Sequence, residues 1–233
     1  MTARTAARSL TERVYGCLRA DILAGRFSPG QRLRPTDLAA VQGVSLNVVR
    51  EALNRLAGER LVQASPQQGF AVVQVSAPDL DDLTDVRVLV ETAALRRSIE
   101  RGDLAWESDL VAAHHRLAHT PMTTPGRPGE LSDEWMHAHN AFHAATMCAC
   151  GSPRLVEMAA TLGESAAMYR YYSQRYDHGR RDVAGEHRAI FEAAIARDIE
   201  LACRLHAEHI QRTAEIVTHA LAESQLQQNP ASA

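Results

Sequence analysis

Residues 33–73 constrain the fold of this chain more than any other stretch, because their spacing has a specific structural interpretation. Across residues 45–57, apolar side chains recur at i, i+3, i+4, i+7 and i+8, which predicts a helix with one buried face. Residues 36–42 predict a short helix that Gly43 stops, so a turn of about three residues separates the two helices. This spacing is typical of a helix-turn-helix.

Two short strands are predicted downstream, at 61–64 and 70–73, around a turn rich in Gln, Pro and Gly. A helix-turn-helix followed by a hairpin predicts a winged domain, with its second helix in the major groove and the hairpin tip at the minor groove. The alternative is an ordinary helical hairpin with a two-stranded flap. The residues expected to meet DNA are Arg34, Thr36, Ser45, Asn47, Arg50, Asn54, Gln68 and Gly69.

The N-terminal third of the chain is basic, although the whole chain has a net charge of −3. Residues 1–75 hold ten Arg against five Asp or Glu, giving +5, so the remainder carries −8. This asymmetry indicates a domain that meets phosphates, tethered to one that does not.

From Pro78 onward the periodicities are helical and no strand is convincing. The segment 120–129 is rich in Pro and Gly and predicts a loop. Helices joined mostly by short turns predict an antiparallel all-helical bundle, so we expect a mainly α fold with domains at 1–77 and 78–233. The expected helices are 78–101, 103–119, 131–150, 153–176, 182–197 and 198–225, besides a first helix from residue 10 to near residue 25.

The chain has no run of about eighteen apolar residues and no charged-then-apolar start. We therefore expect a cytoplasmic protein with no membrane partner.

The eleven histidines all lie at or after residue 114, in the acidic helical part. His139 and His143 stand at i and i+4, which places two imidazoles on one helix face. His187 and His209 each lie eleven residues from Asp198, where we expect two helices to join as a hairpin, so they should reach the same height. Four imidazoles could then converge on one divalent ion.

Each histidine taken alone is better explained as a surface residue or a singly satisfied core residue. His206 is a rival to His209, because it lies about one helical turn away. If the four histidines do share an ion, its affinity should fall as the pH drops through about 6.5, since each ligand must be neutral. We expect solvent exposure for the remaining histidines, which are His114, His115, His119, His137, His178 and His219.

Arg87 stands in an almost wholly apolar stretch of the helix predicted at 78–101, and a buried Arg needs an anion. The favoured partner is Glu91 at i+4. The alternative is direct contact with the carboxylate of a bound effector.

Residues 10–75 resemble the DNA-binding domain of GntR-type bacterial repressors. The resemblance rests on the segments Leu33 to Ala39, Gly43-Val44-Ser45, Val49-Arg50-Glu51-Ala52-Leu53, and Leu61-Val62 followed by Gly69. It departs at Leu46, Asn47 and Val48, where many members carry Arg, Thr and Pro.

Residues 78 to about 220 resemble the effector domain of the FadR subfamily of these regulators. The matching segments are Asn140 to His143, Gly151 to Leu155, Glu186 to Ile190, and a second His twenty-two residues after His187. The resemblance implies a divalent ion, zinc or else nickel, held by His139, His143, His187 and His209, with a small carboxylate beside it. His139 stands where the family usually has Asp or Asn.

The function expected is that of a homodimeric transcriptional regulator, a repressor, which binds a palindromic operator and responds to a small organic acid. Two alternatives stay open at this point. One is a metal-dependent hydrolase in which the ion activates water, and the other is a pure metal sensor.

Overall fold

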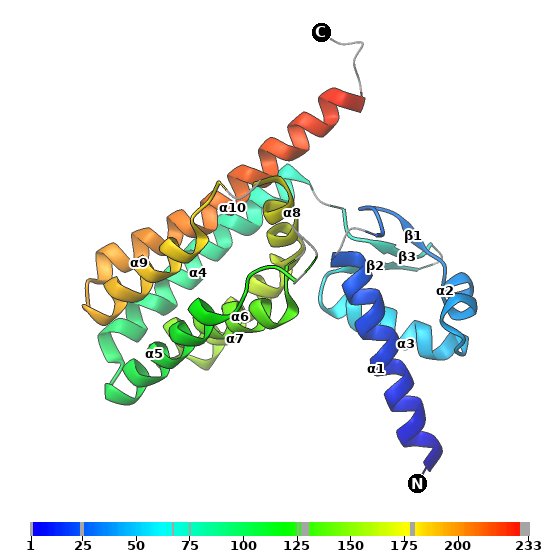
Figure 1. The fold of residues 1–233 in the computed structure, drawn as a ribbon, viewed down its shortest axis with the longest axis horizontal. Helices are drawn as coiled ribbons and strands as arrows, with labels where there is room; N and C mark the ends of the chain where they lie inside the picture. The colour runs from blue at the N-terminus through cyan, green and yellow to red at the C-terminus, as the bar shows by residue number, and fades with distance from the viewer. Residues whose placement is uncertain are drawn as a thin grey trace. The chain divides into compact units, whose positions relative to one another are not determined.

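The computed structural model describes residues 2–23, 26–66, 68–74, 76–124, 126, 131–177 and 180–228, and most of their side chains from residue 10 to residue 223. The chain divides into two compact units, Met1–Val75 and Ser76–Ala233. Both are mainly helical, as the sequence predicted. Figure 1 shows the elements of each unit.

The first unit contains the predicted helix-turn-helix. Its two helices are separated by a short turn, and Gly43 ends the first of them with φ 63°, a left-handed conformation that glycine adopts without strain. Ser45 takes the N-cap position of the second helix. The elements are α1 (Thr2–Leu23), β1 (Arg32–Leu33), α2 (Pro35–Gln42), α3 (Leu46–Gly58), β2 (Val62–Ser65) and β3 (Gly69–Val72).

The wing has three strands in the order β1-β3-β2, all antiparallel. The hairpin of β2 and β3 was predicted, and each strand lies within one residue of its expected position. The strand β1 was not predicted, because two residues are too few to show an alternation. Similarly, α1 begins at Thr2 rather than residue 10, since its first turns lack the apolar repeat.

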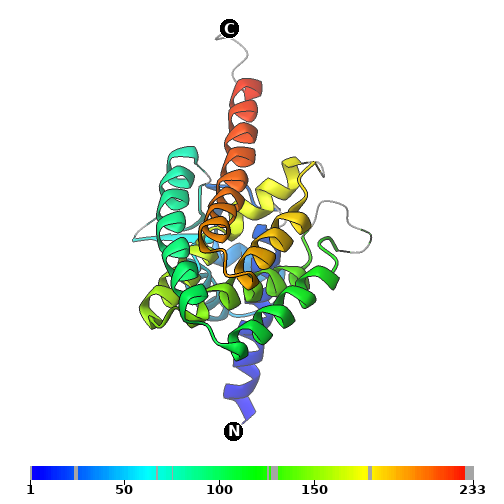
Figure 2. The same cartoon turned by 90° about the vertical axis from the view of Figure 1, so that its left-hand side faces the viewer.

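The second unit is a bundle of helices, and its described residues form no strand beyond one isolated bridge between Thr123 and Leu131. Figures 1 and 2 show α10 running alongside α4 and α9. The elements are α4 (Ala77–Arg101), α5 (Leu104–His119), α6 (Asp133–Met147), the 3-10 turn η1 (Cys148–Cys150), α7 (Pro153–Ser165), α8 (Ala167–Asp177), α9 (Val183–Ile195) and α10 (Ile199–Gln228).

One predicted helix is wrong: residues 153–176 form two helices, α7 and α8, which meet at Ala166. Residues 166–169 are all buried, which departs from the single apolar stripe expected of one amphipathic helix over 153–176. The break is fixed by Arg170, whose Nη1 donates to the carbonyl of Gly163 at 2.9 Å.

The core of the bundle is made by residues from several helices. Phe142, Leu95, Leu110 and Ile190 are fully buried there, and Trp106 donates from Nε1 to the carbonyl of Ala145 at 2.9 Å. Within the described residues, no helix has the length and apolar character needed to cross a membrane.

Candidate functional site

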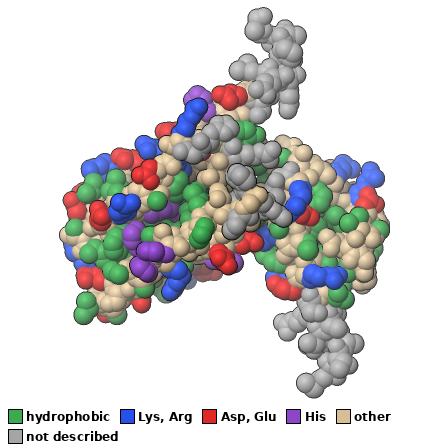
Figure 3. Space-filling model, viewed as in Figure 1, with side chains coloured by type: hydrophobic (Ala, Val, Ile, Leu, Met, Phe, Trp, Pro, Cys, Tyr) green, Lys and Arg blue, Asp and Glu red, His purple; other side chains and the backbone are tan. Residues whose placement is uncertain are grey.

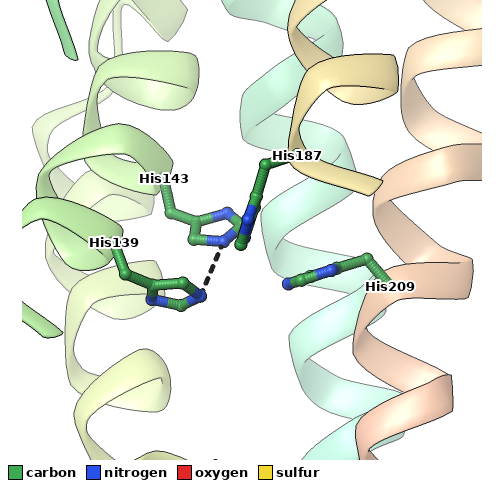
Figure 4. A group of neighbouring side chains, drawn as sticks. All are labelled: His139, His143, His187 and His209. Carbon is green, nitrogen blue, oxygen red and sulfur yellow. Dashed lines mark hydrogen bonds between the residues drawn. The ribbon is translucent and has the colours of Figure 1, made fainter. Parts of the chain in front are cut away.

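Four buried histidines from three helices meet inside the bundle. His139 and His143 come from α6, His187 from α9 and His209 from α10, and their rings face one another (Figure 4). One nitrogen from each lies within 4.8 Å of the corresponding atom of every other. The predicted convergence of these four side chains is therefore present.

The turn between α9 and α10 places His187 and His209 at the same level along the axes of these two helices. The two helices join at residues 196–198, the predicted position, and Asp198 caps α10 by accepting from the N–H of Leu201 at 3.0 Å. Arg197 adopts φ 59°, which lets the chain reverse. The rings of His187 and His209 end with their centroids 4.7 Å apart.

Two of the nitrogens are already as far apart as two ligands of one ion would be. Nε2 of His143 lies 3.2 Å from Nε2 of His139, and two imidazole nitrogens bound tetrahedrally at 2.0–2.1 Å would be separated by about 3.3 Å. Nε2 of His187 and Nδ1 of His143 are buried without a hydrogen-bond partner among the described residues. A buried polar atom without a partner is costly, and an ion within reach of Nε2 of His187 would satisfy it.

Burial also sets the protonation state of the cluster. It lowers the pKa of His139, His143 and His209 well below the usual imidazole value, and it lowers the pKa of His187 to about 3. All four rings are therefore neutral near pH 7, the form in which imidazole binds metal ions.

The carboxylate of Glu186 orients the ring of His209 by contacting the ring nitrogen that points away from the cluster. Oε2 of Glu186 lies 2.7 Å from Nδ1 of His209, which leaves the other ring nitrogen directed toward the cluster. Arg181 holds Glu186 in turn through contacts of 2.8 and 2.6 Å, and it also donates to the carbonyl of His209 at 2.8 Å.

Sequence reasoning missed this Glu186–Arg181 pair. The available signal was the position of Glu186 directly before His187, in the first turn of α9. Arg181 precedes that helix and gave no periodic signal.

A cavity of about 200 Å³ opens against the cluster between α4, α6 and α7. His139 and His143 form part of its wall, and so does Arg87. Arg87 donates from Nε to Oε1 of Glu91 at 2.7 Å, so the predicted pairing at i+4 is confirmed. Burial raises the pKa of the Glu91 carboxyl, but Arg87 and His206 outweigh it and hold that pKa at about 2.

His206 is fully buried and belongs to the Arg87–Glu91 pair rather than to the four-histidine cluster. Its Nε2 lies 2.9 Å from Oε2 of Glu91. The expected solvent exposure of His114 is wrong, since its half-buried ring stacks on Phe191 at 4.2 Å. His115, His119, His137 and His219 are exposed as expected, and His178 lies outside the described residues.

Replacing His206 is expected to destabilise the bundle. His206→Ala would leave Glu91 with Arg87 alone and would open a cavity in the core, which together cost about 2–4 kcal/mol. Chemical denaturation of the variant measures this loss, with His219→Ala on the same helix as the exposed control. Equal stability of the two variants would mean that the His206–Glu91 contact contributes nothing.

In the first unit, α3 presents three different faces. One face is buried and consists of Val49, Ala52, Leu53 and Leu56. A second face contacts α1, where Thr11 donates to Glu51 at 3.3 Å, Arg55 to Glu12 at 2.7 Å, and Tyr15 to Glu59. The third face is exposed and consists of Asn47, Arg50 and Asn54.

All the residues predicted to meet DNA are exposed. Arg34 and Ser45 occupy the N-cap positions of α2 and α3 without a side-chain cap, and Gly69 begins β3 with φ 81°. Thr36 donates to its neighbour Asp37 at 3.2 Å. Arg50 has no hydrogen-bond partner within the described part of the chain, so its guanidinium is available to a ligand. Exposure and availability are what groove contacts require.

Two families match the chain. Residues 10–72 match the family described as bacterial regulatory proteins, gntR family, and residues 82–212 match the FCD domain. The exposed third face of α3 lies in the first match, and the four-histidine cluster lies in the second.

Among the relatives that cover nearly the whole chain are two transcriptional regulators that are more than 30% identical to it. BphR of Paraburkholderia xenovorans, an uncharacterized helix-turn-helix transcriptional regulator, is 37% identical over 90% of this chain and 86% of its own length. The helix-turn-helix transcriptional repressor GlaR of Escherichia coli is 32% identical over 89% of this chain and 96% of its own.

Solved structures share the fold. Escherichia coli McbR/YncC superposes with a TM-score of 0.66 at 24% identity, covering 91% of this chain and 98% of its own. A transcriptional regulator of the GntR family from Pseudomonas syringae gives a TM-score of 0.51 at 22% identity, covering 95% of this chain and 90% of its own.

Proposed function

Because the chain belongs to the gntR family of bacterial transcriptional regulators and carries an FCD domain, we propose that a small organic acid beside a divalent metal ion controls its binding to operator DNA. The chain is a DNA-binding transcriptional regulator and not an enzyme. We take residues 1–77 as the DNA-binding domain with its linker and residues 78–233 as the effector domain.

The proposal is carried by one observation: Arg87, His139 and His143 line the same cavity. The Arg87 side chain is 12% exposed, and its bond to Glu91 uses Nε and Nη2. Nη1 has no hydrogen-bond partner among the described residues, so it can donate to an incoming carboxylate.

The ion would be held by His139, His143, His187 and His209, with zinc the first candidate and nickel the second. All four ligands are neutral, so the ion keeps its full positive charge, which attracts an anion into the cavity. The role of Arg87 is to orient the carboxylate from the opposite side.

Acid binding would favour one geometry of the effector domain, and the paired DNA-binding domains would then no longer match two half-sites a helical turn apart. By this mechanism the protein would be a repressor that its effector releases from the operator. The similarity to GlaR, which is named as a transcriptional repressor, supports this direction of control. A homodimer and a cytoplasmic location stay predictions, and sedimentation of the full chain tests the first.

The test is a titration of operator binding with zinc, with and without short carboxylic acids. We expect release that requires zinc and acid together. Release by zinc alone would identify a pure metal sensor. If acid released the operator from a chain that binds no metal, Arg87 would be the only proposed residue left to bind the carboxylate. That result would contradict the metal part of the proposal.

Replacing Arg50 tests the DNA-binding face of α3. Arg50→Ala is expected to weaken operator binding by about 1–3 kcal/mol if the guanidinium contacts a base, because a groove contact is lost without any change in folding. The measurement is a binding isotherm at fixed salt, with Arg188→Ala on an exposed face of α9 as the control. Unchanged affinity in a folded Arg50→Ala protein would contradict the groove assignment.

A further inference from the structure

The cavity beside the four-histidine cluster is polar at one end only. Along α6, the residues at its wall are first His139, Asn140 and His143, and then, about one turn further, Met147. The Arg87–Glu91 pair lies at the same end as the histidines, because Glu91 contacts His206, whose ring centroid is 5.4 Å from that of His143.

The helix α7 supplies the opposite wall and runs in the opposite sense. Arg170 contacts both the carbonyl of Gly163 at 2.9 Å and Oδ1 of Asn140 at 3.4 Å, which places the end of α7 at the polar end of the cavity. Val156 lies about 10 Å earlier on α7 and so reaches the level of Met147. The far end is lined by the buried Met147 and Ala159, the half-buried Val156, and two exposed alanines at 144 and 160, with no charged or amide group among them. The exposed Glu164 follows Gly163 and so belongs to the polar end.

From this one-sided polarity we infer that the effector is an acid with a single carboxylate and an apolar body of about five to eight carbons. The inference rests on the proposed function, because it assumes that the carboxylate binds at Arg87 and the histidines. The apolar body then lies against Met147, Val156 and Ala159. A cavity of about 150 Å³ holds benzene in another protein, so the 200 Å³ found here suits a body of that size.

A dicarboxylate of the same length would place its second charge against this apolar wall. An ionised group that loses water against Met147, Val156 and Ala159 gains no partner there, so such acids should bind more weakly because of their charge rather than their size. Each methylene group of a monocarboxylate that leaves water should instead tighten binding by about fourfold.

The test uses three acids on the zinc-loaded full chain: acetate, hexanoate and adipate. Hexanoate and adipate have the same number of carbons and differ in the second carboxylate. Calorimetric titration should show hexanoate binding at least about tenfold more tightly than both acetate and adipate. Adipate binding as tightly as hexanoate would overturn the inference while leaving acid binding intact. No binding of any of the three acids would overturn the proposed function itself.

A positive charge placed at the apolar end of the cavity should reverse the preference for hexanoate over adipate. In Val156→Lys the new ammonium group faces the second carboxylate, so adipate should bind more tightly than hexanoate. Met158→Lys is the matched control, because Met158 lies two residues away on α7 with 49% of its surface exposed, and it should keep the preference for hexanoate. An unreversed preference in a folded Val156→Lys protein would overturn the placement of the apolar body.

Discussion

The His143→Ala protein is expected to retain no stoichiometric zinc, whereas the unaltered chain should bind about one ion. The ring of His143 is close to all three others: its centroid is 4.5 Å from that of His139 and 5.2 Å from those of His187 and His209. Its removal leaves three ligands from three different helices and an empty space between them. Elemental analysis of protein purified without a histidine tag measures the metal content.

The same substitution should abolish the stabilisation by zinc. Zinc at a hundredfold excess over its dissociation constant contributes about 2.7 kcal/mol, which raises the melting temperature of a domain of this size by about 5–10 °C. His137→Ala, on an exposed position of the same helix, should keep both the ion and the shift. Basal operator binding should survive in both variants, because the cluster lies in the second unit. Stoichiometric zinc in His143→Ala would show that the ion binds elsewhere.

The four-histidine cluster was predictable because it depends on helix geometry alone. His139 and His143 share a face through their spacing, and His187 and His209 share a height because α9 and α10 are regular and join at the expected residues. The pairing of Arg87 with Glu91 was predictable for the same reason, as a contact within one helix.

The groups that support the cluster were not predictable in this way. The contact of Glu91 with His206 joins residues 115 positions apart, and it depends on how α4 packs against α10. Arg181 reaches His209 from a loop, where no periodicity fixes the direction of a side chain. The break between α7 and α8 was missed for a different reason: it involves a side-chain contact to the backbone, from Arg170 to the carbonyl of Gly163 near the end of α7, which helical periodicity does not indicate.

Burial of the cluster changes the expected effect of pH on metal binding. In water an imidazole gains a proton near pH 6.5, and the spacing of the histidines alone suggested that metal affinity should fall at that pH. In the folded chain, however, burial lowers the pKa of all four ligands, that of His187 to about 3. The folded cluster therefore stays neutral further below pH 6.5 than free imidazole does, and its affinity for zinc should fall less between pH 7.5 and 5.5 than that of four free imidazoles.

The stability of the metal-free protein should instead fall over this range. Below about pH 6.5 the unfolded chain takes up protons on these histidines, and the folded chain does not. The stability they contribute is thus fully present above that pH and is lost as the pH falls. Each imidazole contributes at most about 1.4 kcal/mol per pH unit, and the four together contribute at most about 5.6 kcal/mol per pH unit. Ordinary carboxylates titrate at lower pH and add little in this window.

Two measurements on the same samples separate these effects. Zinc affinity is measured by competition with a chelator at pH 7.5, 6.5 and 5.5, and denaturation of the metal-free protein is followed at the same three values. We expect a smaller fall in affinity than four free imidazoles would show and a steep loss of stability, and the loss should be shallower in His143→Ala because one of the four imidazoles is gone. The opposite result would be a zinc affinity that falls sharply through pH 6.5 while the stability of the metal-free protein stays constant. It would mean that water reaches the four rings in the folded protein, and the burial of the cluster would then be wrong.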